Sequence, residues 1–312
     1  MKISCFGILV ADCVTAPVDA LPRRGTLEIV ERVELHVGGC AANTALALAK
    51  LGEPPVLLGA VGTDALGDFV VATLNAGGVD TRGVRRLSGV PTAATAVCVH
   101  SDAERSFLHV SGANARFIAA DTDWERCHDA AIFHIAGPQL MGALEAENGI
   151  AAVAEEAKRR GMIVTLDTVM NPRSLGYSAL RDALPFLDWV LPSEAEAEQL
   201  TGEKDVRGQA RALRAGGARN VGIKRGDQGC FVLPEAGEPF VVPAFPVVAV
   251  DSLGAGDAWV AGFLLGLLRG WNAAHTARFA NAVGASAVEE YGATTGVRSE
   301  AETLLRVAKA AR

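Results

Sequence analysis

The chain has 312 residues, enough for one large domain or two ordinary ones with a substantial hydrophobic core. Half of its residues are hydrophobic and 21% are charged, the formal net charge is −7, and no basic run or basic–aromatic stripe is present, which argues against nucleic acid as a partner. Six scattered cysteines without a C-x-x-C pair argue against structural zinc, and no apolar run reaches the length of a membrane span, so we expect a cytoplasmic protein without a membrane partner.

The first apolar stretch predicts a buried strand over residues 2–10. A single lysine before that stretch also resembles the start of a signal peptide, but Asp12 interrupts the apolar run early. We therefore prefer the strand.

Two segments of the first third, residues 25–39 and 92–114, have the pattern of β-hairpins with polar turns. Together they predict a small sheet that stands off the main one. Such a sheet over the ends of the main strands would form a lid that excludes water from a transfer reaction, and ordinary surface hairpins are the alternative that these residues leave open.

From about residue 130 onward, apolar strand-like runs alternate with helical stretches. "DAAIFHIAG", "MIVTLDTV", "DWVLPS" and "RNVGIKRG" have the character of strands, and the segments between them that of helices. This alternation predicts βαβ units and a mostly parallel sheet flanked by helices. Ligands of such sheets bind beyond the carboxyl ends of the strands.

A glycine-rich turn joins a strand to a helix near the C-terminal end. The β-branched run 240–250 contains two prolines and predicts an edge or interrupted strand. The apolar run after Asp257 predicts a buried helix, in which Gly262 and Gly266 share one face and imply close packing against another element. Between the predicted strand and the predicted helix, "GAG" at 254–256 lets free helix amides approach an anion such as phosphate.

Asp257 is unexpected in such an anion site because a carboxylate repels phosphate. It fits if it accepts the proton of the group that attacks the phosphate. The alternative is an ordinary carboxylate in the first turn of a helix. No G-x-x-x-x-G-K-[ST] is present, so the sequence does not predict a P-loop enzyme.

Several motifs follow one another along the chain: "GGCAANTALALAKLG", "LGAVGTDALGDFV", "HVSGAN", "LPSEAEAEQLTG", "GIKRGDQGCFV", "DSLGAGD" and "FANAVGASAVEEYGA". In kind and in order they resemble the motifs of the ribokinase-like (PfkB) family of carbohydrate kinases. The resemblance runs nearly end to end. It implies a single ribokinase-like α/β domain over residues 1–312, with a central, mostly parallel β-sheet flanked by helices and a small β-sheet lid from segments of about 13–37 and 90–112.

The resemblance also implies roles for the glycine-rich turn. Gly254, Ala255 and Gly256 would form an anion hole for the phosphoryl group in transit, and Asp257 would be the catalytic base and contact the substrate hydroxyl. Further substrate contacts are implied for Asp12, Gly38, Gly39, Asn43 and Asn114. The alternatives that stay open are a solvated loop position for Asp12, a helix cap for Asn43 and a turn for Asn114.

For the nucleotide, the resemblance implies contacts from Lys224, Gly226, Gly229, Asn281, Ser193 and Glu196. Glu196 would order Mg²⁺ through water. Ser193 stands where the family has asparagine, and a hydroxyl is shorter than an amide, so its contact with phosphate or with a Mg²⁺-bound water is in doubt. Asp251 and the loop 292–297 resemble a site for a monovalent cation such as K⁺.

Two further positions are open at the sequence level. Asp167, in "TLDTVMNPR", either lines the site or braces it. Arg105 or Arg116 would have to supply the positive charge if the acceptor were an already phosphorylated sugar.

We therefore expect an ATP- and Mg²⁺-dependent kinase that phosphorylates a hydroxymethyl group of a small sugar of the ribose or fructose type. The resemblance adds a homodimer formed through the lid. Two alternatives remain: a nucleoside kinase on the same fold, which would need aromatic residues to stack on a base, and a catalytically weak regulator that binds sugar or nucleotide.

Overall fold

The computed structural model describes residues 2–102 and 104–310. Its main sheet has nine strands in the order β13-β12-β11-β10-β9-β8-β1-β4-β5. β12 runs antiparallel to β11 and β13, and the other neighbours are parallel. The strands are β1 (Lys2–Gly7), β4 (Val56–Gly62), β5 (Asp80–Leu87), β8 (Ala130–Ala136), β9 (Ile163–Asp167), β10 (Trp189–Val190), β11 (Asn220–Lys224), β12 (Cys230–Leu233) and β13 (Phe240–Val242).

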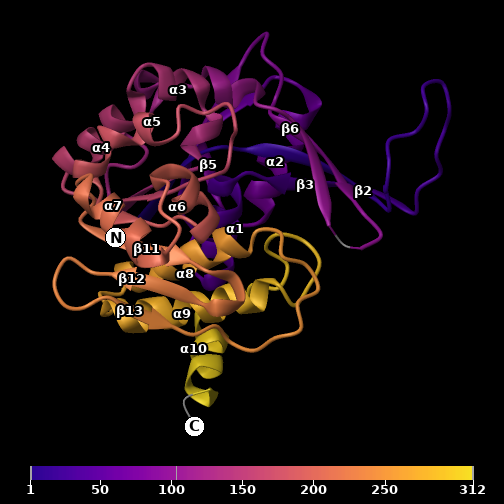
Figure 1. Ribbon diagram of the computed structural model, residues 1–312. Coiled ribbons are helices and arrows are strands. Elements are labelled where there is room, and N and C mark those ends of the chain that lie inside the picture. The colour runs from indigo at the N-terminus through magenta and orange to yellow at the C-terminus, as the bar shows by residue number, and fades with distance from the viewer. Residues whose placement is uncertain (1, 103, 311–312) are drawn as a thin grey trace.

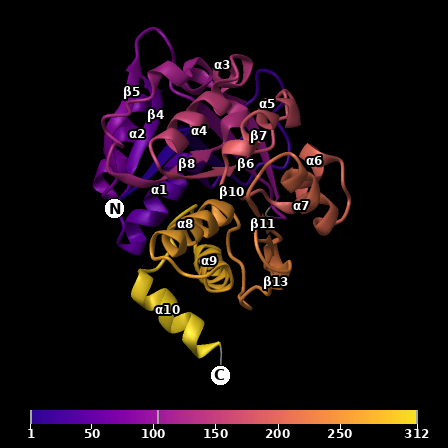
Figure 2. The same ribbon diagram turned by 90° about the vertical axis from the view of Figure 1, so that its left-hand side faces the viewer.

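Helices cover both faces of this sheet (Figures 1 and 2). α1, α2, α8 and α9 contribute to one hydrophobic core, and α3, α4, α5 and α7 to the other. In the described part of the chain, no helix is both long and apolar enough to span a bilayer. The helices are α1 (Cys40–Leu51), α2 (Ala65–Ala76), α3 (Gly142–Ala146), α4 (Gly149–Arg159), α5 (Tyr177–Arg181), α6 (Glu194–Thr201), α7 (Val206–Ala215), α8 (Ala255–Leu268), α9 (Ala273–Ala287) and α10 (Glu300–Lys309).

The alternation predicted after residue 130 is confirmed, and residues 240–250 contain only the short edge strand β13. The prediction of one strand over residues 2–10 is wrong in its extent. The strand ends at Gly7, and after Ile8 and Leu9 the chain enters a different sheet at Val10. An apolar run cannot reveal this division, because residues 3–10 are all buried.

A second sheet, which we call the small sheet, has four strands in the order β3-β2-β6-β7. Its strands are β2 (Val10–Ala16), β3 (Arg32–Gly38), β6 (Ala94–Val99) and β7 (Arg105–Val110). In Figure 1 it lies to one side of the main sheet, where the labels β2, β3 and β6 stand.

One of the two predicted hairpins is confirmed as β6 and β7, which pair antiparallel. Residues 25–39 do not form a hairpin of their own, and that prediction is wrong. Only β3 is a strand there, and it pairs with β2 across the loop 17–31. The reason is that the partner of β3 is β2, which lies outside the segment and upstream of it.

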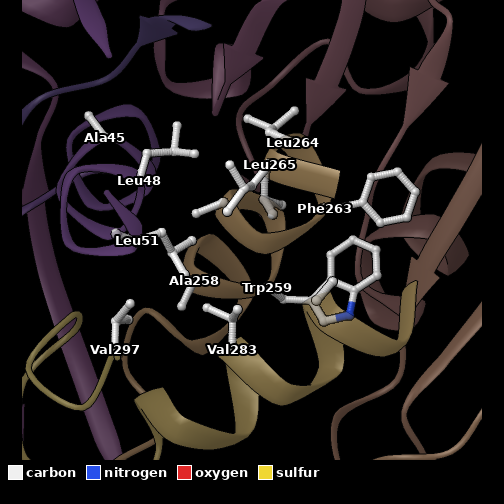
Figure 3. Packing of buried hydrophobic residues seen from close by; sticks show 14 of the residues in the cluster. Ala45, Leu48, Leu51, Ala258, Trp259, Phe263, Leu264, Leu265, Val283 and Val297 are labelled. Atoms are coloured by element: carbon white, nitrogen blue, oxygen red, sulfur yellow. The ribbon is translucent and has the colours of Figure 1, made fainter. Parts of the chain in front are cut away.

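Helix α8 is the centre of one core and positions the glycine-rich turn at its own start. Figure 3 shows its side chains between those of α1 and α9. Gly262 lies against Val283, and Gly266 against Thr276, so that a Cβ on either glycine would press into α9. The close packing predicted for these glycines is therefore confirmed, and it fixes the start of α8 relative to both neighbouring helices.

Candidate active site

The glycine-rich turn forms the N-terminus of α8. Gly254 is the N-cap residue with φ of 70°, and a Cβ there would collide with Ala293. Only glycine satisfies both constraints. The Ala255 amide makes a long contact of 3.3 Å with the Ser252 carbonyl. The first amides of a helix have no acceptor within it, so those of Gly256 and Asp257 can receive an anion.

Asp257 lies one turn into α8 and faces α1. Asn43 Nδ2 donates to Asp257 Oδ2 at 2.8 Å, and the Thr44 hydroxyl is 3.4 Å from the Asp257 carbonyl oxygen. Burial raises the pKa of Asp257 to about 6, although Asn43 and Lys224 favour the charged form. The carboxylate is thus desolvated but still ionised at neutral pH, which suits a general base.

Asp12 belongs to the small sheet and is almost fully buried. Burial raises its pKa, which a hydrogen bond from Thr95 partly offsets. Its carboxylate lies directly over Gly38, where any Cβ would collide with it, and a Cβ on Gly39 would collide with the Ile8 carbonyl. The two glycines therefore let the small sheet and the start of α1 come together around Asp12.

Asn114 is fully buried in the 3₁₀ turn η1 (Gly112–Arg116). Its amide donates to the Leu9 carbonyl at 3.0 Å and accepts from the Leu9 amide at 3.2 Å. It thereby fixes the connection between β1 and β2, close to Asp12 in the chain. Its predicted contact with substrate stays a prediction.

Ser193 and Glu196 form a reciprocal cap at the start of α6. The Glu196 amide lies 3.3 Å from Ser193 Oγ, and Glu196 Oε2 accepts from the Ser193 amide at 2.7 Å. The Thr168 hydroxyl also donates to Glu196, at 3.0 Å. The hydroxyl of Ser193 is therefore used by the helix, and Glu196 is the group of this pair that is left to face the site.

Lys224 ends β11 and forms a buried ion pair with Asp167, at 2.6 Å. Burial raises the pKa of Asp167 to about 7 against the opposing effect of Lys224. The sequence left open whether Asp167 lines or braces the site, and the structure places it at the carboxyl end of β9 beside Lys224. Gly226 and Gly229 form the turn that follows, between β11 and β12.

Asn281 lies in α9 with its side chain buried. It accepts from Trp259 Nε1 at 2.7 Å and donates to the carbonyls of Val242 and Pro243, both at 3.0 Å. These contacts join α8, α9 and the end of β13. A role of Asn281 next to the adenine stays a prediction. In that role, these hydrogen bonds would hold in place the backbone that surrounds the adenine.

Asp251 precedes the glycine-rich turn and is held from several sides. It accepts from the amides of Leu253 at 2.7 Å and Gly292 at 3.0 Å, and it pairs with Arg105 of β7. Burial opposes its charge, but these donors outweigh burial and lower its pKa. A guanidinium from the small sheet thus contacts the carboxylate for which the sequence predicted a monovalent cation.

Sequence reasoning gave no role to Cys40, the first residue of α1. Burial, together with the nearby carboxylates of Asp257 and Asp167, raises the pKa of its thiol well above the usual value, so the thiol is neutral. In turn, the thiol lowers the pKa of Asp257 and thus favours the charged form of that carboxylate. Its position inside "GGCAAN" was a signal that could have identified it.

The described residues contain no cluster of three or more His, Cys, Asp or Glu side chains that could hold a metal ion. The predicted role of Glu196 in ordering Mg²⁺ through water stays a prediction. The site as a whole is a desolvated carboxylate beside a helix terminus with free amides, with the ammonium of Lys224 and additional carboxylates around them.

Comparison with known proteins gives a consistent result. The family described as pfkB family carbohydrate kinase matches residues 1–300. An ATP-dependent ribose-1-phosphate kinase of Halopiger xanaduensis is 32% identical over 289 residues, 92% of each chain, and a ribokinase of Haemophilus influenzae is 28% identical over 309 residues, 97% of each chain. Among solved structures, an Arabidopsis thaliana ribokinase complexed with ribose and ATP has a TM-score of 0.86 at 26% identity and 98% coverage of both chains.

Proposed function

The chain belongs to the pfkB family of carbohydrate kinases, and we propose that it transfers the γ-phosphoryl group of ATP to a hydroxymethyl group of a small sugar of the ribose or fructose type. The observation that carries this proposal is the position of Asp257. It is partly buried, its raised pKa of about 6 leaves it charged at neutral pH, and it stands directly after the free amides at the start of α8.

In the proposed reaction, Asp257 takes the proton of the sugar hydroxyl while its oxygen forms a bond to the γ-phosphorus. The bond from that phosphorus to the β-phosphate oxygen breaks, and ADP leaves. The amides of Gly254, Ala255 and Gly256 would receive the charge that develops on the transferring oxygens, with the Ala255 amide giving up its long contact with the Ser252 carbonyl. Removal of one such donor costs about 3 kcal/mol of barrier in comparable sites.

The sugar and the nucleotide would approach the base from opposite sides. Asp12 of the small sheet and Asn43 of α1 would hold sugar hydroxyls, since each offers an acceptor of fixed geometry. Lys224, the turn 226–229 and the region packed by Asn281 would hold the nucleotide. Bound Mg²⁺ would neutralise phosphate charge, and Glu196 would hold its waters.

A nucleoside is the second candidate acceptor, and one aromatic residue favours it. Phe107 of β7 is opposite Val97, as His109 is opposite Thr95 and Thr95 is opposite Asp12. Phe107 therefore lies on the same face of the small sheet as Asp12, and it is 56% exposed. An exposed ring at that place could stack on a base.

We also propose a homodimer formed through the opposite face of the small sheet. Leu35, Cys13, Ala96 and Leu108 form one row across its strands on that face. Leu35 is 41% exposed and Leu108 is 62% exposed. Contiguous exposed apolar surface of this kind marks an interaction site.

The test is ADP release with MgATP and potassium against a panel of pentoses, hexoses, sugar acids, sugar phosphates and nucleosides. Asp257→Asn is expected to lower kcat by about two powers of ten or more, because the base is lost while its volume is kept. Asp68→Asn is the matched control, since Asp68 is an exposed first-turn carboxylate of another helix.

Each other outcome has a definite meaning. If the two variants lose equal activity, Asp257 is an ordinary first-turn carboxylate. If only nucleosides react, the sugar assignment is wrong. If ATP binds but no acceptor reacts, the chain is a binding regulator and not a kinase.

A further inference from the structure

A buried ion pair joins the ends of two strands of the main sheet. Asp167 is the last residue of β9 and Lys224 the last residue of β11, with β10 between them. Their side chains are 2% and 11% exposed. So deep a pair adds little net stability, because the desolvation of both charges offsets their attraction. The position of the pair therefore says more about its role than its contribution to stability does.

The ammonium of this pair lies beside the anion hole. A Cβ at Gly256 would be 3.5 Å from Lys224 Nζ, an ordinary contact distance. Asp167 accepts one hydrogen bond from the ammonium, and an ammonium has three N–H groups that can donate. A phosphoryl oxygen at the first turn of α8 can take another. The next cation in the chain, Arg225, donates instead to Glu194 and Gln228.

The charges around Lys224 keep it protonated. Burial alone would lower its pKa, but the carboxylates of Asp167, Glu196 and Asp257 outweigh burial and raise it. Three carboxylates compete for this one ammonium, and the structure gives its hydrogen bond to Asp167. The position of Asp167 thus determines which of the three carboxylates the Lys224 ammonium pairs with.

We propose that Asp167 is a positioning residue that aims the Lys224 ammonium at the phosphoryl group in transit. The inference rests on the proposed kinase function and extends it to a residue that touches neither the sugar nor the nucleotide. Lys224 stabilises the oxygens of the γ-phosphoryl group while its bond to the ADP oxygen breaks. Asp167 holds the flexible lysine side chain away from Asp257, so that the ammonium does not pair with the base.

The experiment measures kcat and both KM values for single and double variants of the full chain. Lys224→Met is expected to lower kcat by about 10² to 10³, as the loss of a preorganised donor does, and Lys224→Arg to restore part of it. Asp167→Asn is expected to lower kcat by about ten- to hundredfold without changing the KM for the sugar. The double variant should be no slower than Lys224→Met alone, because Asp167 acts only through Lys224.

Glu194→Gln is the matched control, since it removes the partner of Arg225 at the same edge of the sheet and should leave kcat unchanged.

The proposal is overturned if Asp167→Asn keeps the wild-type kcat, or if it slows the Lys224→Met enzyme as much as it slows the wild type. If thermal melting shows that Asp167→Asn alone does not fold, the double variant, which leaves neither charge of the pair unpaired, is compared with Lys224→Met: equal rates support the proposal and a further loss overturns it. A wild-type chain that releases no ADP contradicts the proposed function instead.

Discussion

Asp257 is subject to two opposing effects. Burial favours its neutral form, while Asn43, Lys224 and Cys40 favour its charged form, and together they set a pKa of about 6. A base with such a pKa is ionised at neutral pH and still basic enough to take a proton from a hydroxyl group in the transition state. The chemistry of the site therefore depends on the neighbours of Asp257 as much as on the carboxylate itself.

This balance predicts the pH dependence of the enzyme. Because the base must be deprotonated, kcat/KM should fall as the pH drops through about 6. Asn43→Ala removes a donor that stabilises the carboxylate, so the pKa should rise and the acid limb of the profile should move to higher pH. The measurement is kcat/KM across the acid and neutral range. An acid limb that stays in place, or moves to lower pH, would contradict the assignment of that limb to Asp257.

The sequence motifs predicted which residues form the site, but they could not show what their side chains bond to. Asn43 and Asn281 both follow from motifs, yet Asn43 donates to Asp257 whereas Asn281 bonds to Trp259 and the end of β13. The difference lies in partners far away in the chain. A motif indicates that a side-chain amide is required at a position. Only the packing shows whether that amide binds a ligand or another part of the protein.

Helix α6 shows how an element can compensate for a departure from the family pattern. Ser193 stands where the resemblance to the family implies asparagine, but its hydroxyl caps the helix and its backbone amide donates to Glu196. Serine and asparagine are both good N-cap residues. The first turn that carries Glu196 is thus kept in place by either side chain.

Ser193→Ala should lower the free energy of unfolding by about 1 kcal/mol, whereas Ser193→Asn should preserve it. Ser299→Ala is the control, because Ser299 forms the same kind of capping box with Glu302 in α10. We expect both alanine variants to lose similar stability in urea unfolding, and only Ser193→Ala to raise the KM for MgATP. An equal KM in the two variants would show that α6 does not contribute to nucleotide binding.

Strand β7 links the small sheet to the glycine-rich turn through Arg105 and Asp251. Arg105→Ala leaves a buried carboxylate without its cation, and we expect kcat to fall by about tenfold. If the cation site predicted at Asp251 exists, potassium chloride should restore the variant more than it stimulates the wild type. Choline chloride at equal ionic strength is the control. Equal effects of the two salts would argue against a potassium site there.

At the scale of the whole molecule, the proposed dimer depends on the apolar face of the small sheet. Leu108→Glu should shift the molecular mass measured by light scattering from dimer to monomer, because it buries a charge in the interface. Leu305→Glu is the matched control, since Leu305 of α10 is 61% exposed and Leu108 is 62% exposed. A wild type that is already monomeric, or a dimer that survives Leu108→Glu, would contradict this interface.

The parts of the fold that could be predicted are those that are indicated by short stretches of sequence. The alternation of strands and helices, the start of α8 and the order of the motifs all lie within short windows. The contacts that define the site do not: Asp167 and Lys224 are 57 residues apart, Arg105 and Asp251 are 146, and Asn43 and Asp257 are 214. No periodicity in one segment specifies a partner at such a separation.

The small sheet is assembled from two stretches of chain, β2–β3 and β6–β7, with α1, β4, α2 and β5 between them. They join side by side only where β2 pairs with β6. A recombination event that exchanges one stretch alone must still match it to the other along that seam, and an event that exchanges both also brings α1, β4, α2 and β5 with them. The small sheet therefore cannot be exchanged apart from these elements of the main domain. We expect it to diverge mainly by point substitutions on either side of the seam.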